Sequence, residues 1–454
     1  MTVEGLTINS LKKKDLLTLG FMMFSIYFGA GNLIFPPALG QAAGDHTLHA
    51  MLGFMTTGIG LPLLGITAIA LAGGEYVPLL HAKTWPRFAT VLLVILYLII
   101  GPLFAMPRTG AVSFEIGIRP FLSADNLALG QIIYTAIFFA SSYYLALNPN
   151  KIIDRVGRML TPALLIVLLI LFVQAFHAPL GAILPATGAY IDAPFAQGFQ
   201  DGYQTMDLLA SIAIGALVAN AVRMRGITDS RAVGAACLVS GLITVMLMAA
   251  VYGSLAYIGA TSTSVLGQAE NGGQILSAAV GIFFGSAGNL LLAVIIGLAC
   301  LTTCCGITSS AAMFFNKLLK GRVSYERLLL FSIMFSFAAS NVGLTQIIAL
   351  AIPFLVTIYP LIIVFVILSL FDRFIGWRKS IYQGAMALTL VFSLIDGLHA
   401  AGLSSEPVHA LLVAYIPFYN IMMGWVCPAV TGALVGLAVS FFQTAPAAAK
   451  ESQV

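Results

Sequence analysis

The chain has 454 residues, of which 60% are hydrophobic and only 8% are charged, with a formal net charge of +4 at pH 7. This composition excludes an ordinary water-soluble domain and is typical of a protein that crosses a membrane many times, and it gives no reason to expect nucleic-acid binding. The five cysteines lie in apolar stretches without a CxxC pair beside a His or Cys cluster, so neither a disulfide framework nor a metal site of that kind is expected.

Apolar blocks of about 20 residues, long enough to cross the hydrocarbon of a bilayer, recur along the chain. They predict twelve transmembrane helices, an all-α polytopic architecture, with the first and sixth helices broken. The expected spans are 15–43, 48–73, 88–112, 127–147, 157–178, 195–222, 230–258, 286–316, 326–342, 345–371, 380–400 and 419–443. The lysines before the first span are expected to stay in the cytoplasm, with no cleavable signal peptide.

The positive charges predict the orientation of these spans. Nineteen Lys and Arg residues, Lys12 and Lys450 among them, fall on one side, and only Arg108 and Arg119 fall on the other. Because Lys and Arg collect in cytoplasmic loops, both termini are expected in the cytoplasm and the protein in the cell (inner) membrane. The segment 404–443 is too long for one span, so 407–418 is expected to lie at the interface or half buried.

The two broken spans stand five spans apart, which is typical of two five-helix halves of inverted topology. These halves would be 15–178 and 195–371, followed by two additional helices in 380–443, all in one transporter domain. The external loop 259–285 is long enough to fold back as a lid, and an ordinary ordered loop is the alternative.

The first break lies in residues 21–37, FMMFSIYFGAGNLIFPP. A helix break at bilayer depth survives only where it is buried or lines a cavity. The half-helix from about Leu33 to Ala43 would offer free N–H groups to a carboxylate, and the half ending near Phe28 would offer free carbonyls to an ammonium group or a bare cation. The break therefore suits a zwitterionic amino acid, although a packing kink would use glycines too.

The second break lies between Gly198 and Leu209. Asp207 is costly at this depth, and a carboxylate inside the membrane is a functional hypothesis by default. Three roles stay open for it: capping the helix from Leu208 onward, contact with a cation or ammonium group, and proton relay. An apolar pocket for a substrate side chain is expected from Phe24, Tyr27, Phe28, Met206 and Leu209.

Two further groups of residues can carry chemistry. Ala299, Thr302 and Thr303 share one helix face and offer hard oxygen donors, which suit Na⁺, although a Thr hydroxyl in a membrane helix usually bonds to its own helix. Arg108 and Glu115 stand seven residues apart and could form a gate or a structural ion pair. Asp396 and His399 are expected at the interface.

The strings GFMMFSIYFGAGNLIFPP, GPLFAMPRTGAVSFE, GYQTMDLLA and ACLTTCCGIT resemble those of the branched-chain amino acid:cation symporters, the LIVCS or BrnQ family. The resemblance covers nearly the whole chain. It implies the LeuT-type fold of the amino acid–polyamine–organocation superfamily. It also implies uptake of leucine, isoleucine and valine with Na⁺, or with H⁺ as discussed for some relatives.

The resemblance also implies residue roles. The amides of Ala30 and Gly31 would hold the substrate carboxylate, whereas the role of Asp207 does not transfer. Na⁺ would bind carbonyls near Ser25 and Phe28, the Ala299 carbonyl, and the hydroxyls of Thr302 and Thr303. The expected substrate-binding residues are Tyr27, Ala30, Gly31, Asn32, Thr205, Met206, Asp207 and Leu209.

The expected function is Na⁺-coupled uptake of branched-chain amino acids by alternating access, with no cofactor and no enzymatic activity. H⁺ coupling and a nucleobase or other cation symporter of the same fold are the nearest alternatives. An intramembrane enzyme lacks its signatures, because HExxH, GxSxG and GxGD are absent from the sequence. A channel would need a charged ring or a repeated filter loop, and neither is visible.

Overall fold

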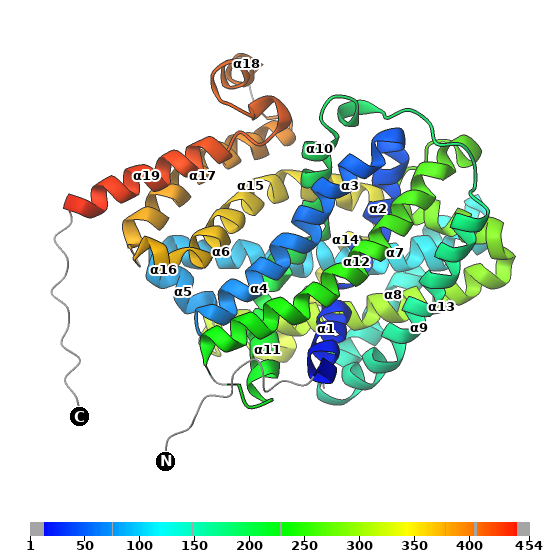
Figure 1. Ribbon diagram of the computed structural model, residues 1–454. Helices are drawn as coiled ribbons and strands as arrows, with labels where there is room; N and C mark the ends of the chain where they lie inside the picture. Colours follow the sequence, from blue (N-terminus) through cyan, green and yellow to red (C-terminus); the bar gives the residue numbers. More distant parts are fainter. Residues whose placement is uncertain are drawn as a thin grey trace.

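The computed structural model describes residues 13–74, 76–147, 149–227, 229–376, 378–403 and 406–442, without the side chains of 149–161. Lys12 and Lys450 of the orientation argument lie outside these ranges. All regular elements in the described ranges are helical (Figure 1). Seven helical stretches there are long and apolar enough to cross a membrane: 30–71, 86–121, 124–146, 230–266, 272–318, 344–370 and 379–400.

Both predicted breaks are present. The first separates α1 (Lys13–Tyr27) from α2 (Ala30–Ala43), with Gly29 in an extended conformation between them. The second follows α10 (Pro194–Asp201) and one 3₁₀ turn (Gly202–Thr205), and it precedes α11 (Asp207–Arg223). Met206 stands at the second break with a φ of 63°, a left-handed conformation that a non-glycine residue rarely adopts.

A third break, which the sequence analysis did not predict, divides the predicted span 88–112. Here α6 (Pro86–Leu98) passes through a π turn (Ile99–Leu103) into α7 (Ala105–Gly117). Gly101 has non-helical angles, and Pro102 has no N–H to donate. A second π turn (Thr56–Gly60) joins α3 (Thr47–Met55) to α4 (Leu61–Leu71).

The other long helices are α8 (Leu127–Ala146), α9 (Pro149–His177), α12 (Ser230–Leu266), α13 (Gly272–Leu318), α14 (Tyr325–Ser340), α15 (Leu344–Leu370), α17 (Lys379–Ala400) and α19 (Val426–Phe442). The short ones are α5 (Tyr76–Lys83), α16 (Asp372–Ile375) and α18 (Glu406–Tyr415). α18 projects beyond the bundle, whereas α17 and α19 lie side by side at its edge (Figure 1).

The predicted external loop is largely helical. α12 continues to Leu266, and α13 begins at Gly272 with Asn271 as its N-cap, so only a few residues between them are not helical. α13 kinks at Gly285, whose φ is 65°. The segment 272–284 is therefore a helical arm that precedes the predicted span 286–316.

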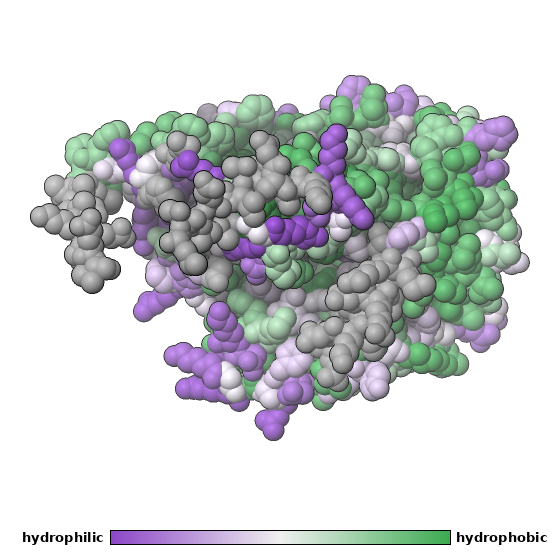
Figure 2. All heavy atoms as spheres, turned by 60° about the horizontal axis from the view of Figure 1, so that its bottom comes forward, coloured by the Kyte–Doolittle hydropathy of each residue, from purple (hydrophilic) through white to green (hydrophobic). Residues whose placement is uncertain are grey.

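The outer surface suits a lipid environment. Large apolar side chains such as Ile137, Leu169, Phe331 and Val435 are more than half exposed. Figure 2 shows green hydrophobic residues over the right flank and purple hydrophilic residues gathered toward the lower left. Apolar flanks beside a polar face are expected of a membrane-spanning protein.

Candidate functional site

The break between α1 and α2 is organised by one side chain. The Asn32 amide oxygen accepts the Gly29 N–H at 3.1 Å, and the Asn32 N–H returns to the Gly29 carbonyl at 3.2 Å. Ala30 and Gly31 occupy the first turn of α2, where N–H groups have no acceptor within the helix. The break thus presents backbone donors at the positive end of a helix, as the sequence predicted for a carboxylate.

Asn32 also connects the two breaks. Its Nδ2 donates to the Asp207 carboxylate at 2.7 Å and contacts the Tyr252 hydroxyl, which lies 3.5 Å from the same carboxylate oxygen. Met206 stands at the N-cap of α11, and the hydrogen bonds of the Asp207 carboxylate go to Asn32 and Tyr252. Asp207 instead ties the start of α11 to the start of α2 and to α12.

Arg108 of α7 lies at the junction of the breaks. Its Nη1 and Nη2 donate to the carbonyls of Gln204 and Thr205 at 2.5 and 3.4 Å. Glu115 accepts hydrogen bonds from Arg119 at 2.6 Å and from Asn271 and Gln274 at 3.2 and 2.9 Å. Since Glu115 pairs with Arg119, the predicted ion pair between Arg108 and Glu115 is not formed.

Glu115 therefore holds the helical arm 272–284 to the outer end of α7. Asn271 and Gln274 belong to the start of that arm, and Gly272 packs directly on the Ile34 carbonyl of α2. The arm lies against the half-helix that follows the first break. Glu115 thus ties the start of this arm to α7.

The predicted cation ligands come from α1 and α13. The Thr302 hydroxyl donates to the Ala299 carbonyl at 3.0 Å, the local bond that the sequence analysis kept as the alternative. The Thr303 methyl group lies 3.5 Å from the position where a Cβ on Gly29 would stand. Gly29, directly after Phe28, thus lies against the Thr303 side of α13. Oxygen donors of this kind fit a hard cation such as Na⁺.

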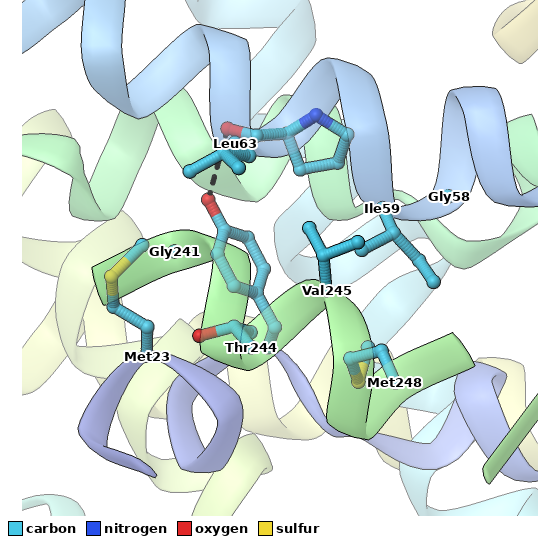
Figure 3. Close-up of a pocket in the computed structure, with 10 residues that line it drawn as sticks. Met23, Gly58, Ile59, Leu63, Gly241, Thr244, Val245 and Met248 are labelled. Atoms are coloured by element: carbon cyan, nitrogen blue, oxygen red, sulfur yellow. Dashed lines mark hydrogen bonds between the residues drawn. The ribbon is translucent and has the colours of Figure 1, made fainter. Parts of the chain in front are cut away.

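Tyr27 is the last residue of α1 and was predicted to contact the substrate. Its hydroxyl donates to the Pro62 carbonyl at 3.4 Å, drawn dashed in Figure 3. Its ring lines a small cavity of about 10 Å³, between α1, α4 and α12, together with Met23, Ile59, Leu63 and Met248. A cavity of this size holds at most one water molecule. Tyr27 therefore faces the α4 and α12 side of α1.

The other predicted pocket residues are buried. Phe28 stacks on Phe24 at 5.1 Å between ring centroids, and Met206 and Leu209 are buried in the apolar core of the second break. The Thr205 hydroxyl donates to the Gly202 carbonyl at 2.9 Å and lies 3.4 Å from the Asp207 N–H. Thr205 thus supports the second break from within.

The sequence analysis missed three residues that shape the site. Tyr252 of α12 contacts both Asn32 and Asp207. Thr57, in a π turn, donates to the Phe199 carbonyl at 2.6 Å, and Tyr359 of α15 stacks on Tyr203 at 4.3 Å. In the sequence, each of these residues could be noticed only as a lone hydroxyl inside an apolar span. Their partners lie far away along the chain, so their contacts could not be predicted.

The chain matches the family model described as branched-chain amino acid transport protein over residues 12–443. It is 46% identical to the branched-chain amino acid permease BraB of Bacillus subtilis, covering 96% of this chain and 97% of that protein. It is 44% identical to the branched-chain amino acid transport system 2 carrier protein of Pseudomonas aeruginosa, covering 92% and 94%.

Two solved structures have a similar fold. One is Mhp1, a nucleobase–cation symport family transporter in a closed conformation with bromovinylhydantoin bound (TM-score 0.57, 14% identity, 94% of this chain and 92% of that chain). The other is MhsT in complex with L-phenylalanine (TM-score 0.55, 17% identity, 93% and 98%). Both have the LeuT-type fold, so the similarity identifies that fold for this chain.

Proposed function

The chain belongs to the family of branched-chain amino acid transport proteins, and from this membership we propose that it takes up leucine, isoleucine and valine by secondary active transport coupled to Na⁺. It is a transport protein and not an enzyme, as its relatives are permeases and carriers. The proposal includes twelve spans with inverted five-helix halves, cytoplasmic termini and alternating access.

The observation that carries this proposal is the meeting of two broken helices. Arg108 lies beside the backbone of Gly31 and donates to the carbonyls of Gln204 and Thr205, so the two breaks meet at this side chain, and Met206 and Leu209 add apolar surface there. Backbone groups would grip the common part of an amino acid, and apolar side chains would accept its aliphatic part.

The coupling ion supplies the driving force. A zwitterion carries no net charge, so the membrane potential acts on the cation, at about 2.3 kcal/mol per charge for each 100 mV. That energy corresponds to roughly fifty-fold accumulation. In this mechanism Na⁺ binds between α1 and α13 and steadies the break before the amino acid binds.

Proton coupling is the second candidate, and the buried Asp207 carboxylate favours it. Asp207 is only 4% exposed and is hydrogen-bonded to Asn32 and Tyr252. A carboxylate in that setting is a typical proton carrier of transporters. Both candidates keep the same substrate and the same breaks.

Uptake of radiolabelled leucine into proteoliposomes, with Na⁺ and pH gradients imposed separately, tests the proposal. We expect an inward Na⁺ gradient alone to drive accumulation, and uptake driven only by the pH gradient would assign coupling to H⁺. Isoleucine and valine should compete, because one methylene changes affinity by only about 1–3 kcal/mol, whereas lysine and glutamate should not. Absence of leucine uptake under every gradient would refute the function itself.

A further inference from the structure

The Arg108 guanidinium is a buried charge without an acidic partner. The side chain is 4% exposed, and no Asp or Glu oxygen of the described residues lies within 4.0 Å of it. Glu115, seven residues further along α7, already pairs with Arg119, and Asp207 is bonded to Asn32 and Tyr252. The charge of Asp207 acts on Arg108 through space but forms no salt bridge with it. A buried charge without a direct partner is costly, so Arg108 calls for a function.

The Arg108 guanidinium is held in place, but not all of its N–H donors have an acceptor. Two of its five N–H donors use the carbonyls of Gln204 and Thr205, and the buried Nε has no partner. Its carbon lies 5.2 Å from the centre of the Phe35 ring. The group is thus fixed by the 3₁₀ turn Gly202–Thr205 and by α2, with donor capacity left over.

The same guanidinium touches the first break. A Cβ on Gly31 would stand 2.9 Å from Nη2, closer than such contacts allow, so the backbone of Gly31 lies directly beside the charge. The first turn of α2, where N–H groups have no acceptor within the helix, therefore lies beside a buried cation. The helix end and the unpartnered arginine are two independent features that favour an anion.

We infer that Arg108 binds the α-carboxylate of the transported amino acid, together with the amides of Ala30 and Gly31. This inference rests on the proposed function, because it places the substrate at the junction of the breaks. A carboxylate supplies both the missing negative charge and the acceptors for unused N–H donors. Arg108 is then a specificity-determining residue rather than a gate.

The test compares leucine with leucinamide, in which a neutral amide replaces the carboxylate and the amine is kept. Binding of each ligand to the purified full chain in detergent is measured by isothermal titration, at a pH where both amines are protonated. The wild-type protein should prefer leucine by at least about thirtyfold, the size of effect typical of a buried charge pair. Equal binding of the two ligands would overturn the inference without any variant.

The variant Arg108→Gln should weaken leucine binding by at least about thirtyfold, while leucinamide changes by no more than a few-fold. The preference for leucine over leucinamide is then lost. Equal weakening of both ligands would show that Arg108 only supports the structure and would overturn the inference. Arg231→Gln is the control, because it removes an exposed arginine at the start of α12 and should leave the preference intact.

A second variant covers the case in which Arg108→Gln does not fold. Arg108→Lys keeps the charge but loses the paired N–H groups, so the preference should shrink and remain above one. An unchanged preference in this variant would also overturn the inference. A wild-type protein that binds neither ligand would refute the proposed function instead, so the two failures are distinguishable.

Discussion

Gly31 shows most directly how the choice of one residue determines the geometry of the site. Without a side chain, its backbone approaches the Arg108 guanidinium, and a Cβ would come within 2.9 Å of Nη2 and 3.2 Å of the Phe35 ring. Arg108 cannot swing aside freely, since two carbonyls of the second break hold it. The glycine is therefore required for close approach of backbone to charge.

Gly31→Ala should lower leucine affinity by at least about tenfold, because the methyl group displaces the guanidinium or α2. Gly253→Ala is the control: an added Cβ there meets nothing within 4 Å, and alanine favours the helix. Leucine titration of both purified variants is the measurement. Wild-type affinity in Gly31→Ala would show that the approach at Gly31 has no part in binding.

At the residue scale, the sequence predicted the important side chains more accurately than it predicted their contacts. Asn32 and Asp207 were both singled out, yet their hydrogen bond joins positions 175 apart in the chain. Tyr252 was missed because a tyrosine inside an apolar span is usually a packing residue. Its role becomes visible only when α12 is placed beside α2.

At the scale of the helices, two neighbouring threonines of α13 have different surroundings. The Thr302 hydroxyl is already bonded to the Ala299 carbonyl, whereas Thr303 lies against Gly29 at the first break. The breaks themselves could be predicted, since glycine and polar residues interrupt apolar runs there. The break at Gly101 was missed, although Gly-Pro marks it, because the surrounding run stays apolar.

Thr303→Ala should raise the Na⁺ concentration for half-maximal leucine uptake by several-fold, and more than Thr302→Ala does. The reason is that the Thr302 hydroxyl is already used within α13, while Thr303 lies against Gly29 at the first break. Initial uptake rates over a Na⁺ series measure the effect. Unchanged Na⁺ dependence in the double variant would remove this cation site.

Glu115→Ala should loosen the helical arm 272–284, since it deletes the acceptor of Asn271 and Gln274. Amide hydrogen exchange in 272–284 should become roughly tenfold faster, as expected when bonds worth about 1 kcal/mol or more are lost. The segment 380–400 of α17 serves as the internal control. Identical exchange in the arm would show that Glu115 does not fasten it.

Across the whole molecule, a buried ion pair joins distant parts of the chain. Lys83 of α5 donates to the Asp372 carboxylate at 2.8 Å, and the Tyr382 hydroxyl donates to the same oxygen at 2.9 Å. Burial lowers the pKa of Lys83, and Asp372 opposes that shift. The pair connects the end of α5 to α16 and α17, the region that begins the two additional helices.

Lys83→Met should lower the melting temperature in detergent by several degrees, because it leaves the Asp372 carboxylate buried and unpaired, at a cost of about 3–5 kcal/mol. Adding Asp372→Leu should recover part of the loss. Lys317→Met, which changes an exposed lysine, is the control. A melting temperature equal to that of the wild type in Lys83→Met would show that the pair adds no stability.

Hydropathy predicted the all-helical, many-span character of the molecule and the approximate position of most helices. Element ends were less accurate: α12 continues eight residues beyond the predicted end at 258, and the arm 272–284 joins α13 without a loop. Hydropathy predicts where a chain leaves the hydrocarbon, but it does not predict where a helix ends when that helix continues into water. Contacts among α2, α7, α11 and α12 depend on packing that no single span encodes.

The interruption at Gly101 leaves α7 as a separate rod. Arg108 and Glu115 are both on this rod, about 10 Å apart along its axis at 1.5 Å per residue. Arg108 lies against the second break, and Glu115 accepts a hydrogen bond from Gln274 of the helical arm 272–284. Because α7 is one continuous helix from Ala105 to Gly117, the contact of Arg108 with the second break and the hydrogen bonds of Glu115 to the arm belong to the same element.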